Sequence, residues 1–178
     1  HRQTARAIQT MIVRGAGTIG ATGAYGLAQA ALEAPSNHTM RFIKFIDRAH
    51  LRLLKTRPTA VDLLHSMRQV VCAMALALPE EEASDRDAIR LMRKAAVKEA
   101  NRLADEYVTA ARRIAEIGLP LMKKNSRILT HCNAGWLALV DWGSAPAPIY
   151  LAHRKGRKVF VWVDETRPRN QGSNLTSW

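Results

Sequence analysis

The stretch RILTHCNAG, residues 127–135, decides how the chain is expected to fold. It opens with a short run of apolar and β-branched residues, and a second such run follows at residues 158–163. Between the two runs, residues 136–153 are compatible with a helix that Pro146 and Pro148 interrupt. A strand, a crossover and a second strand form the pattern of a parallel α/β sheet. We therefore expect an α/β protein with a parallel sheet in its last third.

The chain before this stretch is expected to be helical. Apolar residues recur at spacings of three and four, as in amphipathic helices. We expect a short helix around Ile8 and two further helices, with Thr39 and Thr59 at their N-terminal caps. The longest helix should run from its cap, Ser84, to Gly118 as its stop.

The helix that follows Thr59 carries one regular apolar stripe. Its members are Leu63, Met67, Val70, Met74 and Leu78. Cys72 lies in the middle of this apolar stretch, so we expect it to be buried and chemically inert.

Two domains are expected, a helical domain over residues 1–125 and the first part of an α/β domain over residues 126–178. Two strands alone leave a parallel sheet incomplete, because such sheets are normally buried on both faces. An uncovered apolar face is therefore predicted. The chain begins without a methionine and stops at Trp178 just where another helix is expected to start, so we interpret it as part of a longer protein.

Composition limits the class of protein. Of the 178 residues, 47% are apolar, which is enough for one core of ordinary size or two small ones. The longest apolar run, residues 70–78, is far shorter than the roughly 20 residues that span a bilayer. Two cysteines without a CxxC pattern do not indicate zinc, and no secretory leader is recognisable. We expect a soluble, cytoplasmic, reduced protein.

Basic residues exceed acidic ones by 27 to 15, and the excess is uneven. Residues 1–57 alone hold nine Lys or Arg and two Asp or Glu. A basic surface of this kind indicates either solubility with weak nucleic-acid contact or a site for a phosphorylated substrate. No lysine-rich tail, zinc finger or aromatic RNA-binding signature is present, so no specific nucleic-acid partner is expected.

Two segments of the helical part could bind phosphate. In residues 11–25 (MIVRGAGTIGATGAY), glycines allow a sharp turn, and free amides at the next helix start could face an anion beside Arg14. The same small residues could merely permit tight helix packing. In residues 56–61 (TRPTAV), Pro58 fits the first turn of a helix and places Arg57 in the preceding loop. Arg57 is then either a phosphate ligand or an ordinary surface arginine.

Two further segments follow the predicted strands. Ligands of open α/β sheets bind outside the carboxyl ends of the strands, where Cys132 is expected to lie before a turn and a helix start. Such a cysteine gains thiolate character, although most cysteines are inert packing residues. Residues 164–176 follow the second strand and offer carboxylates, arginines and amides. They form either a solvated turn or a second wall of the same site, with Gln171 holding a ligand.

Four motifs together carry a family resemblance: VRGAG, TRPTAV, ILTHCNAG and VDETRPRNQGSNLT. In this order and spacing they resemble the methylthioribose-1-phosphate isomerase family, which is related to ribose-1,5-bisphosphate isomerases and to the alpha, beta and delta subunits of translation initiation factor 2B. The resemblance covers nearly the whole chain. It implies an N-terminal helical domain, a Rossmann-like α/β domain and a homodimer.

The resemblance also implies roles for individual residues. Arg14, Gly15 and Ala16 match the substrate-binding RGA element, and Arg57 matches a second phosphate-binding arginine. A substrate-binding glutamine and the catalytic cysteine fall on Gln171 and Cys132. The family's catalytic aspartate belongs to a later motif that has no counterpart in these residues.

The implied activity is an aldose–ketose isomerisation of 5-methylthioribose 1-phosphate to 5-methylthioribulose 1-phosphate in methionine salvage, without a metal or another cofactor. Gly17 departs from the proline that is usual in these enzymes and is typical of ribose-1,5-bisphosphate isomerases, whereas Ala134 and Gly135 favour the methylthioribose enzymes. A non-catalytic subunit that binds a nucleotide or sugar phosphate is the remaining alternative. The expected partners are a sugar phosphate and a second copy of the chain, with no membrane.

Overall fold

The computed structural model describes residues 1–79 and 83–177, and they group into two compact units, His1–Ala104 and Asp105–Trp178. The division lies within the helix α5 (Asp85–Gly118), whereas residues 126–178 were predicted as the second domain. The predicted boundary falls in the loop after the short 3₁₀ helix η1 (Leu119–Leu121). Within the described residues, every helix is too short or too polar to cross a membrane.

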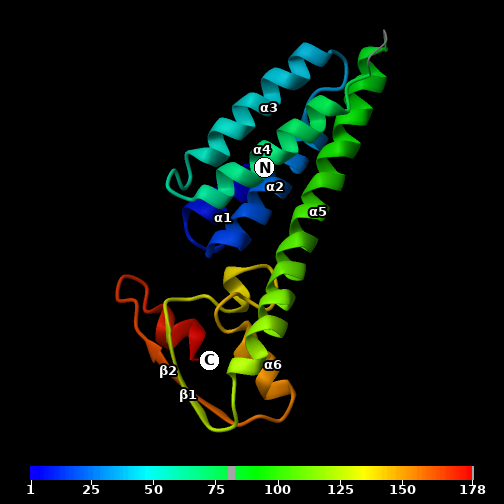
Figure 1. The fold of residues 1–178 in the computed structure, drawn as a ribbon. Coiled ribbons are helices and arrows are strands. Elements are labelled where there is room, and N and C mark those ends of the chain that lie inside the picture. The colour runs from blue at the N-terminus through cyan, green and yellow to red at the C-terminus, as the bar shows by residue number, and fades with distance from the viewer. Residues whose placement is uncertain (80–82, 178) are drawn as a thin grey trace. The chain divides into compact units, whose positions relative to one another are not determined.

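The first unit is built around one buried helix. This helix, α2 (Ala16–Glu33), packs against α1 (Arg2–Gln9), α3 (Thr39–Leu54) and α4 (Val61–Leu76), all labelled in Figure 1. Eleven of its 18 residues are buried, and most of them are glycine or alanine, so its neighbours approach closely. A substituent at Gly23, for example, would meet Leu63 Cδ1 at 2.4 Å. The predicted close packing of these glycines is confirmed.

Most members of the predicted apolar stripe, Leu63, Met67, Val70 and Met74, are buried in this core. The large side chains that are fully buried here include Ile8, Leu27, Phe42, Leu53, Leu63, Met67 and Ile89. Arg93 of α5 also joins the unit, because its Nε and Nη2 donate to the carbonyls of Ala31 (2.9 Å) and Ala34 (2.6 Å) at the end of α2. A helix end has carbonyls without intrahelical partners, and Arg93 satisfies two of them.

Helix starts agree with the prediction at one position and differ at two. Ser84 caps α5, since its Oγ accepts from the amide of Asp87 at 3.1 Å. Thr39 is already helical, and the cap is His38, whose Nδ1 accepts from Met40. Thr59 does not cap α4, which begins after Ala60 without a side-chain cap.

Cys72 corrects another expectation, because it is exposed rather than buried. The buried residues of α4 are Leu63, Ser66, Met67, Val70 and Met74, so the core stripe is narrow and Cys72 lies outside it. Leu78, the last member of the predicted stripe, is 39% exposed beyond the helix end. An uninterrupted run of apolar residues hides which face of the helix points inward.

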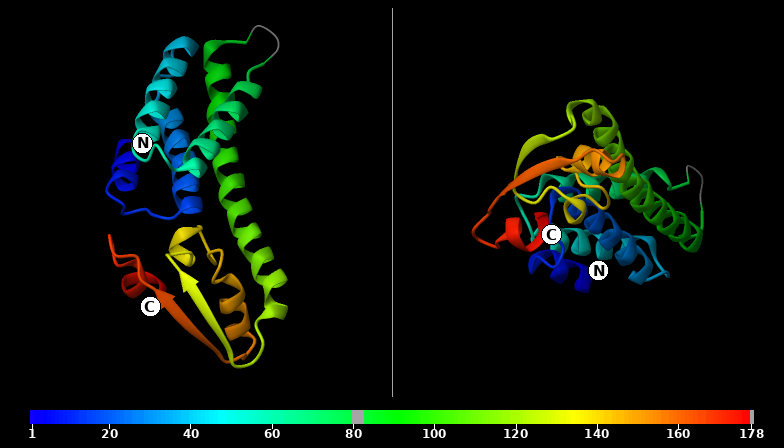
Figure 2. Two further views of the ribbon diagram at one scale, coloured as in Figure 1. Left: turned by 60° about the vertical axis from the view of Figure 1, so that its left-hand side comes forward. Right: turned by 90° about the horizontal axis from the view of Figure 1, so that it is seen from below.

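The second unit contains two parallel strands, β1 (Ser126–His131) and β2 (Val159–Asp164), which lie side by side in Figure 2. They pair in register from Ser126 opposite Val159 to His131 opposite Asp164. The predicted strands and their parallel direction are confirmed, and so is the class of fold, a helical part followed by the start of a parallel α/β part.

The connection between the strands is less helical than expected. Only the 3₁₀ helix η2 (Trp136–Ala138) and α6 (Ala147–Arg154) form within it. Pro146 is the N-terminal cap of α6, and Val140 and Trp142 have positive φ, so the backbone between the two helices is irregular. The two prolines therefore fix where α6 begins instead of interrupting a longer helix.

One face of the sheet is exposed, as predicted. Leu129, Phe160 and Trp162 are 65%, 54% and 58% exposed, and the rings of Phe160 and Trp162 are in edge contact. Leu129 and Trp162 are paired in the register, so all three side chains lie on the same face.

Candidate functional site

Arg14 lies in the turn between α1 and α2. Gly15, the cap of α2, has φ 91°, a backbone conformation that favours glycine, and α2 begins at the next residue. The Nε of Arg14 donates to the carbonyl of Met11 at 3.1 Å, which fixes the guanidinium beside this helix start. Amides in the first turn of a helix lack intrahelical partners and face anions favourably. The predicted turn and helix start are confirmed, and phosphate binding there stays a prediction.

Arg57 lies in a turn before α4. The amide of Ala60 donates to the Arg57 carbonyl at 3.0 Å, so Pro58 occupies this turn and not the first turn of the helix, which corrects the prediction. Helix α4 begins directly after this turn, at Val61. One terminal nitrogen of Arg57, Nη1, is buried and has no hydrogen-bond partner among the described residues. A buried donor without a partner is costly, and an anion would satisfy it.

Cys132 directly follows β1 at the carboxyl end of the sheet. It is exposed and has φ 65°, so the chain turns sharply at this residue. The short η2 follows instead of a regular helix, so the predicted helix start beside the thiol is absent. Next to it, Nδ1 of His131 lies 3.4 Å from Oδ2 of Asp164 across the strand ends. The sequence alone did not indicate this contact, because strand register decides which residues face each other.

The segment after β2 closes over the same strand end. Gln171 is the first residue of the turn into η3 (Gly172–Thr176), and Oγ1 of Thr176 donates to the carbonyl of Cys132 at 3.2 Å. The segment therefore contacts the backbone of Cys132, and its role as a second wall of a binding site stays a prediction. The role of Gln171 in binding stays a prediction.

Glu165 organises that segment. Its carboxylate accepts from three backbone amides: Oε1 from Thr166 (2.8 Å) and Gly172 (2.7 Å), and Oε2 from Ser173 (3.1 Å). Desolvation acts to raise the pKa of Glu165, but these amide donors outweigh it, so the pKa lies below its usual value. Glu165 was not singled out from the sequence. A sign of its role in the sequence is that this acidic residue precedes the pair Gly172 and Ser173 by seven positions.

Two more donors, in the residues that follow the strands, lack partners among the described residues. Asn133 Nδ2 and Thr166 Oγ1 are buried and make no hydrogen bond within the described part of the chain. They follow β1 and β2 respectively, at the edge where α/β sheets bind ligands. A ligand with several hydroxyl groups would satisfy both.

The second unit thus unites Cys132 with the segment of residues 165–176. Arg14 and Arg57 belong to the first unit, and their convergence on one anion stays a prediction, as does their approach to Cys132. The arrangement in the second unit offers a thiol, a His–Asp pair and free polar groups at the carboxyl ends of parallel strands. These features define a protein with a helical unit and an α/β unit that carries its candidate chemistry at the strand ends.

The particular family follows from comparison with known proteins. The model of the initiation factor 2 subunit family matches residues 12–178, and the chain belongs to this family. The chain is 43% identical to the methylthioribose-1-phosphate isomerase of Rhodospirillum rubrum, over 98% of its own length and 44% of that relative. It therefore spans less than half the length of this curated relative.

Two solved structures are similar as well. The 5-methylthioribose 1-phosphate isomerase from Pyrococcus horikoshii has a TM-score of 0.84 at 35% identity, and 99% of this chain aligns with 47% of that one. The delta subunit of translation initiation factor eIF-2B from A. fulgidus has a TM-score of 0.83 at 37% identity, with 99% and 49% coverage. The likeness in fold therefore extends to an isomerase and to a protein named as an initiation-factor subunit.

Proposed function

We propose that the protein containing this chain is an aldose–ketose isomerase that converts 5-methylthioribose 1-phosphate to 5-methylthioribulose 1-phosphate. The observation that carries this proposal is the strand end at which Cys132 is exposed and the segment of residues 165–176 contacts it. The 43% identity to a methylthioribose-1-phosphate isomerase supports this choice of substrate.

The reaction requires the ring to open although phosphate occupies the anomeric oxygen. When the bond between C1 and the ring oxygen breaks, that oxygen takes a proton. The hydrogen on C2 then moves to C1, and the C2 hydroxyl loses its proton to become a carbonyl. We assign a proton transfer at C2 to Cys132, shared with an acid outside these residues. A hydride shift assisted by the same groups has the same balance of atoms.

The phosphate would be held by the helical unit. We assign this contact to Arg14, the amides of Gly15 and Ala16, and Arg57, whose buried Nη1 lacks a partner among the described residues. Gln171 would bind a sugar hydroxyl. Fixing the phosphate and a hydroxyl places C1 and C2 in one orientation, which is a large part of the acceleration that a positioned reaction gains.

The test is a matched pair of serine variants in the full-length protein, assayed with methylthioribose 1-phosphate. We expect Cys132→Ser to lower kcat about 100-fold or more, because general acid–base groups contribute factors of this size. Cys72→Ser should retain turnover, since both thiols are exposed but only one lies at the strand end. Equal losses in the two variants would contradict the assignment. If the protein converts ribose 1,5-bisphosphate and not methylthioribose 1-phosphate, the proposed identity of the substrate is wrong.

A second candidate function is favoured by the likeness to the initiation-factor subunit. In that case the protein would bind a sugar phosphate or nucleotide without converting it. Full-length protein that binds methylthioribose 1-phosphate but shows no turnover, with Cys132 intact, would support this alternative.

We also propose that the protein is a cytoplasmic homodimer that takes a sugar phosphate as its partner. The family resemblance supports this assembly. Sedimentation of the full-length protein at several concentrations measures it directly, and a monomer throughout would contradict it.

A further inference from the structure

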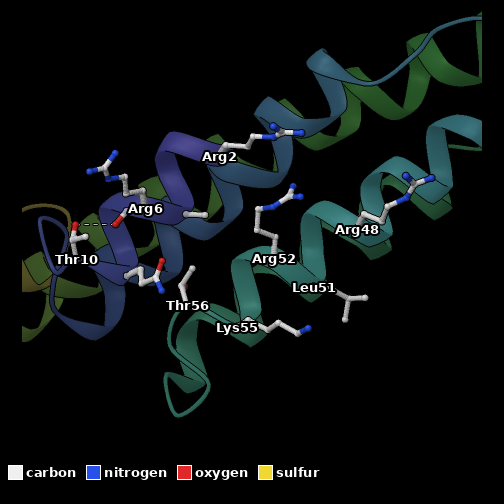
Figure 3. Close-up of a pocket in the computed structure, with 10 residues that line it drawn as sticks. Arg2, Arg6, Thr10, Arg48, Leu51, Arg52, Lys55 and Thr56 are labelled. Carbon is white, nitrogen blue, oxygen red and sulfur yellow. Dashed lines mark hydrogen bonds between the residues drawn. The ribbon is translucent and has the colours of Figure 1, made fainter.

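A groove in the helical unit is lined by side chains that the proposed isomerisation does not use. It lies between α1 and α3 and encloses about 740 Å³. Small-molecule sites in proteins are typically about 300–1,000 Å³, so the groove is large enough for a ligand. Figure 3 shows the side chains that line it.

The groove is strongly basic. Its lining, as far as the described residues show it, includes Arg2 and Arg6 from α1, Arg48 and Arg52 from α3, and Lys55 directly after α3, but no Asp or Glu. These five side chains are more than half of the nine Lys and Arg in residues 1–57. The excess charge seen in the sequence is therefore concentrated and not diffuse. Like charges at close range repel, and a bound anion would relieve this repulsion.

Most of these cations have no partner of their own in the part of the chain that the structure describes. Within the described residues, the side chains of Arg2, Arg48 and Lys55 take part in no ion pair or hydrogen bond. Arg52 is held in place, because its Nη1 lies 2.8 Å from Nε2 of His1. That ring in turn lies against the carboxylate of Glu33, with Nδ1 2.5 Å from Oε2.

The spacing of the charges favours an extended anion over a single small one. Arg48, Arg52 and Lys55 follow each other at four and three residues, which places them along one side of α3. At about 1.5 Å per residue, successive positions are about 4.5–6 Å apart along the axis. Arg2 and Arg52 project toward each other from the two helices, whereas Arg6 points away from α3 (Figure 3). The groove thus presents a row of cations on one side and an arginine on the other.

The lining also argues for phosphate over nucleic-acid bases. Among residues 1–79 and 83–177 it contains no aromatic side chain, and single-stranded nucleic acids are generally bound by stacking their bases on such side chains. Arginine binds phosphate oxygens through two parallel hydrogen bonds, which makes it well suited to a chain of phosphates.

We propose that the groove between α1 and α3 binds a small anion that carries two or more linked phosphate groups. This site uses none of the residues assigned to the isomerase substrate, so it stands whether or not the isomerase proposal holds. Linked phosphates would contact the row of Arg48, Arg52 and Lys55, with Arg2 closing over them from α1.

The experiment is calorimetric titration of the full-length protein with sodium tripolyphosphate, and with orthophosphate for comparison. We expect tripolyphosphate to bind one per chain and at least about tenfold more tightly than orthophosphate, because it contacts several cations at once. The double variant Arg48→Glu/Lys55→Glu should weaken the binding of tripolyphosphate by about tenfold or more. The milder Arg48→Gln/Lys55→Gln variant should weaken binding less, and it covers the case in which charge reversal disturbs folding.

The matched control is Lys94→Glu/Lys98→Glu, two exposed cations of α5, a helix that contributes no residue to the groove lining, with the same change in net charge. Its affinity should stay within about twofold of the parent, since distant surface charges are screened at physiological salt. Equal weakening by the control, equal affinity for orthophosphate, or no binding of tripolyphosphate would overturn the proposal. Tighter binding of a single-stranded oligouridylate than of tripolyphosphate would overturn it as well.

Discussion

The helical unit and the α/β unit differ in how they bury their large apolar side chains. The main buried cluster draws all its members from residues 5–103, including Phe42, Leu27 and Met67. In the α/β unit, the buried apolar residues are mainly alanines with Ile149, while Phe160 and Trp162 are more than half exposed. Stability therefore resides mainly in the first unit, and the strand-end site of the second depends on local hydrogen bonds.

The sharpest test of this difference compares two phenylalanines. Phe42→Ala is expected to lower the free energy of unfolding by about 3–5 kcal/mol, because Phe42 is 1% exposed in the core. Phe160→Ala should cost less than about 1 kcal/mol in residues 1–178, because its ring is 54% exposed. Urea unfolding of both variants measures the two losses.

Similar losses for both variants in residues 1–178 would refute the contrast. The same pair in the full-length protein extends the test. A large cost of Phe160→Ala there, together with a small one in residues 1–178, would mean that other parts of the protein cover this face of the sheet.

A pair of glycines tests how tightly the strand-end site is packed. Gly143 and Gly156 both have φ near 70°, so alanine is strained at either position. Only at Gly143 would the added Cβ meet backbone, the carbonyl oxygen of Ala134 at 2.4 Å. We expect Gly143→Ala to cost about 2–3 kcal/mol and Gly156→Ala about 1 kcal/mol.

Thermal unfolding gives these costs, and alkylation of Cys132 reports on the loop that Gly143 supports. Gly143→Ala should change the alkylation rate, whereas Gly156→Ala should leave it as in the parent. Identical effects of the two substitutions would mean that backbone strain alone matters and that the contact with Ala134 does not.

The smallest expected effect concerns Glu165 and pH. Amide donors lower its pKa in the folded protein below the usual 4.5, so the folded state favours the ionised carboxylate. The ionised carboxylate of Glu165 therefore holds residues 165–173 in place fully above about pH 4.5, and this stabilisation is lost as the pH falls through the lowered pKa. Glu165→Gln should remove this pH dependence and speed hydrogen exchange at the amides of Gly172 and Ser173 at neutral pH.

Glu116→Gln serves as the control, since Glu116 is exposed and pairs with Arg113 on α5, away from the segment of residues 165–176 in the sequence. It should leave exchange at Gly172 unchanged. If Glu165→Gln also leaves it unchanged, the three hydrogen bonds do not hold the segment.

Patterns that depend on near neighbours in the sequence were predicted well. The bounds of α5 follow from Ser84 and Gly118, and both strands follow from short β-branched runs, because these signals are local. The position of Cys132 at a strand end followed in the same way. The exposure of Cys72 did not, since a continuous apolar run does not tell the inner face of a helix from the outer one.

Features that depend on contacts between distant segments could not be predicted. Asp85 of α5 bonds the backbone and side chain of Thr39, which removes Thr39 from the capping role that its type suggests. The His131–Asp164 contact depends on strand register, and the bond from Thr176 to Cys132 joins residues 44 positions apart. A single sequence contains no information on such pairs.

The composition of α2 has a consequence for how the chain folds during synthesis. Between residues 16 and 32 this helix has no Lys, Arg, Asp or Glu, and its apolar and small residues face all sides. Its partner α4 emerges some 30 residues later, so the nascent helix is exposed until α4 is available. Chains fold from the N-terminus as they are made, and exposed apolar segments aggregate. Substitutions that weaken the α2–α4 contact should therefore reduce the yield of folded protein before they change any property of the protein that does fold.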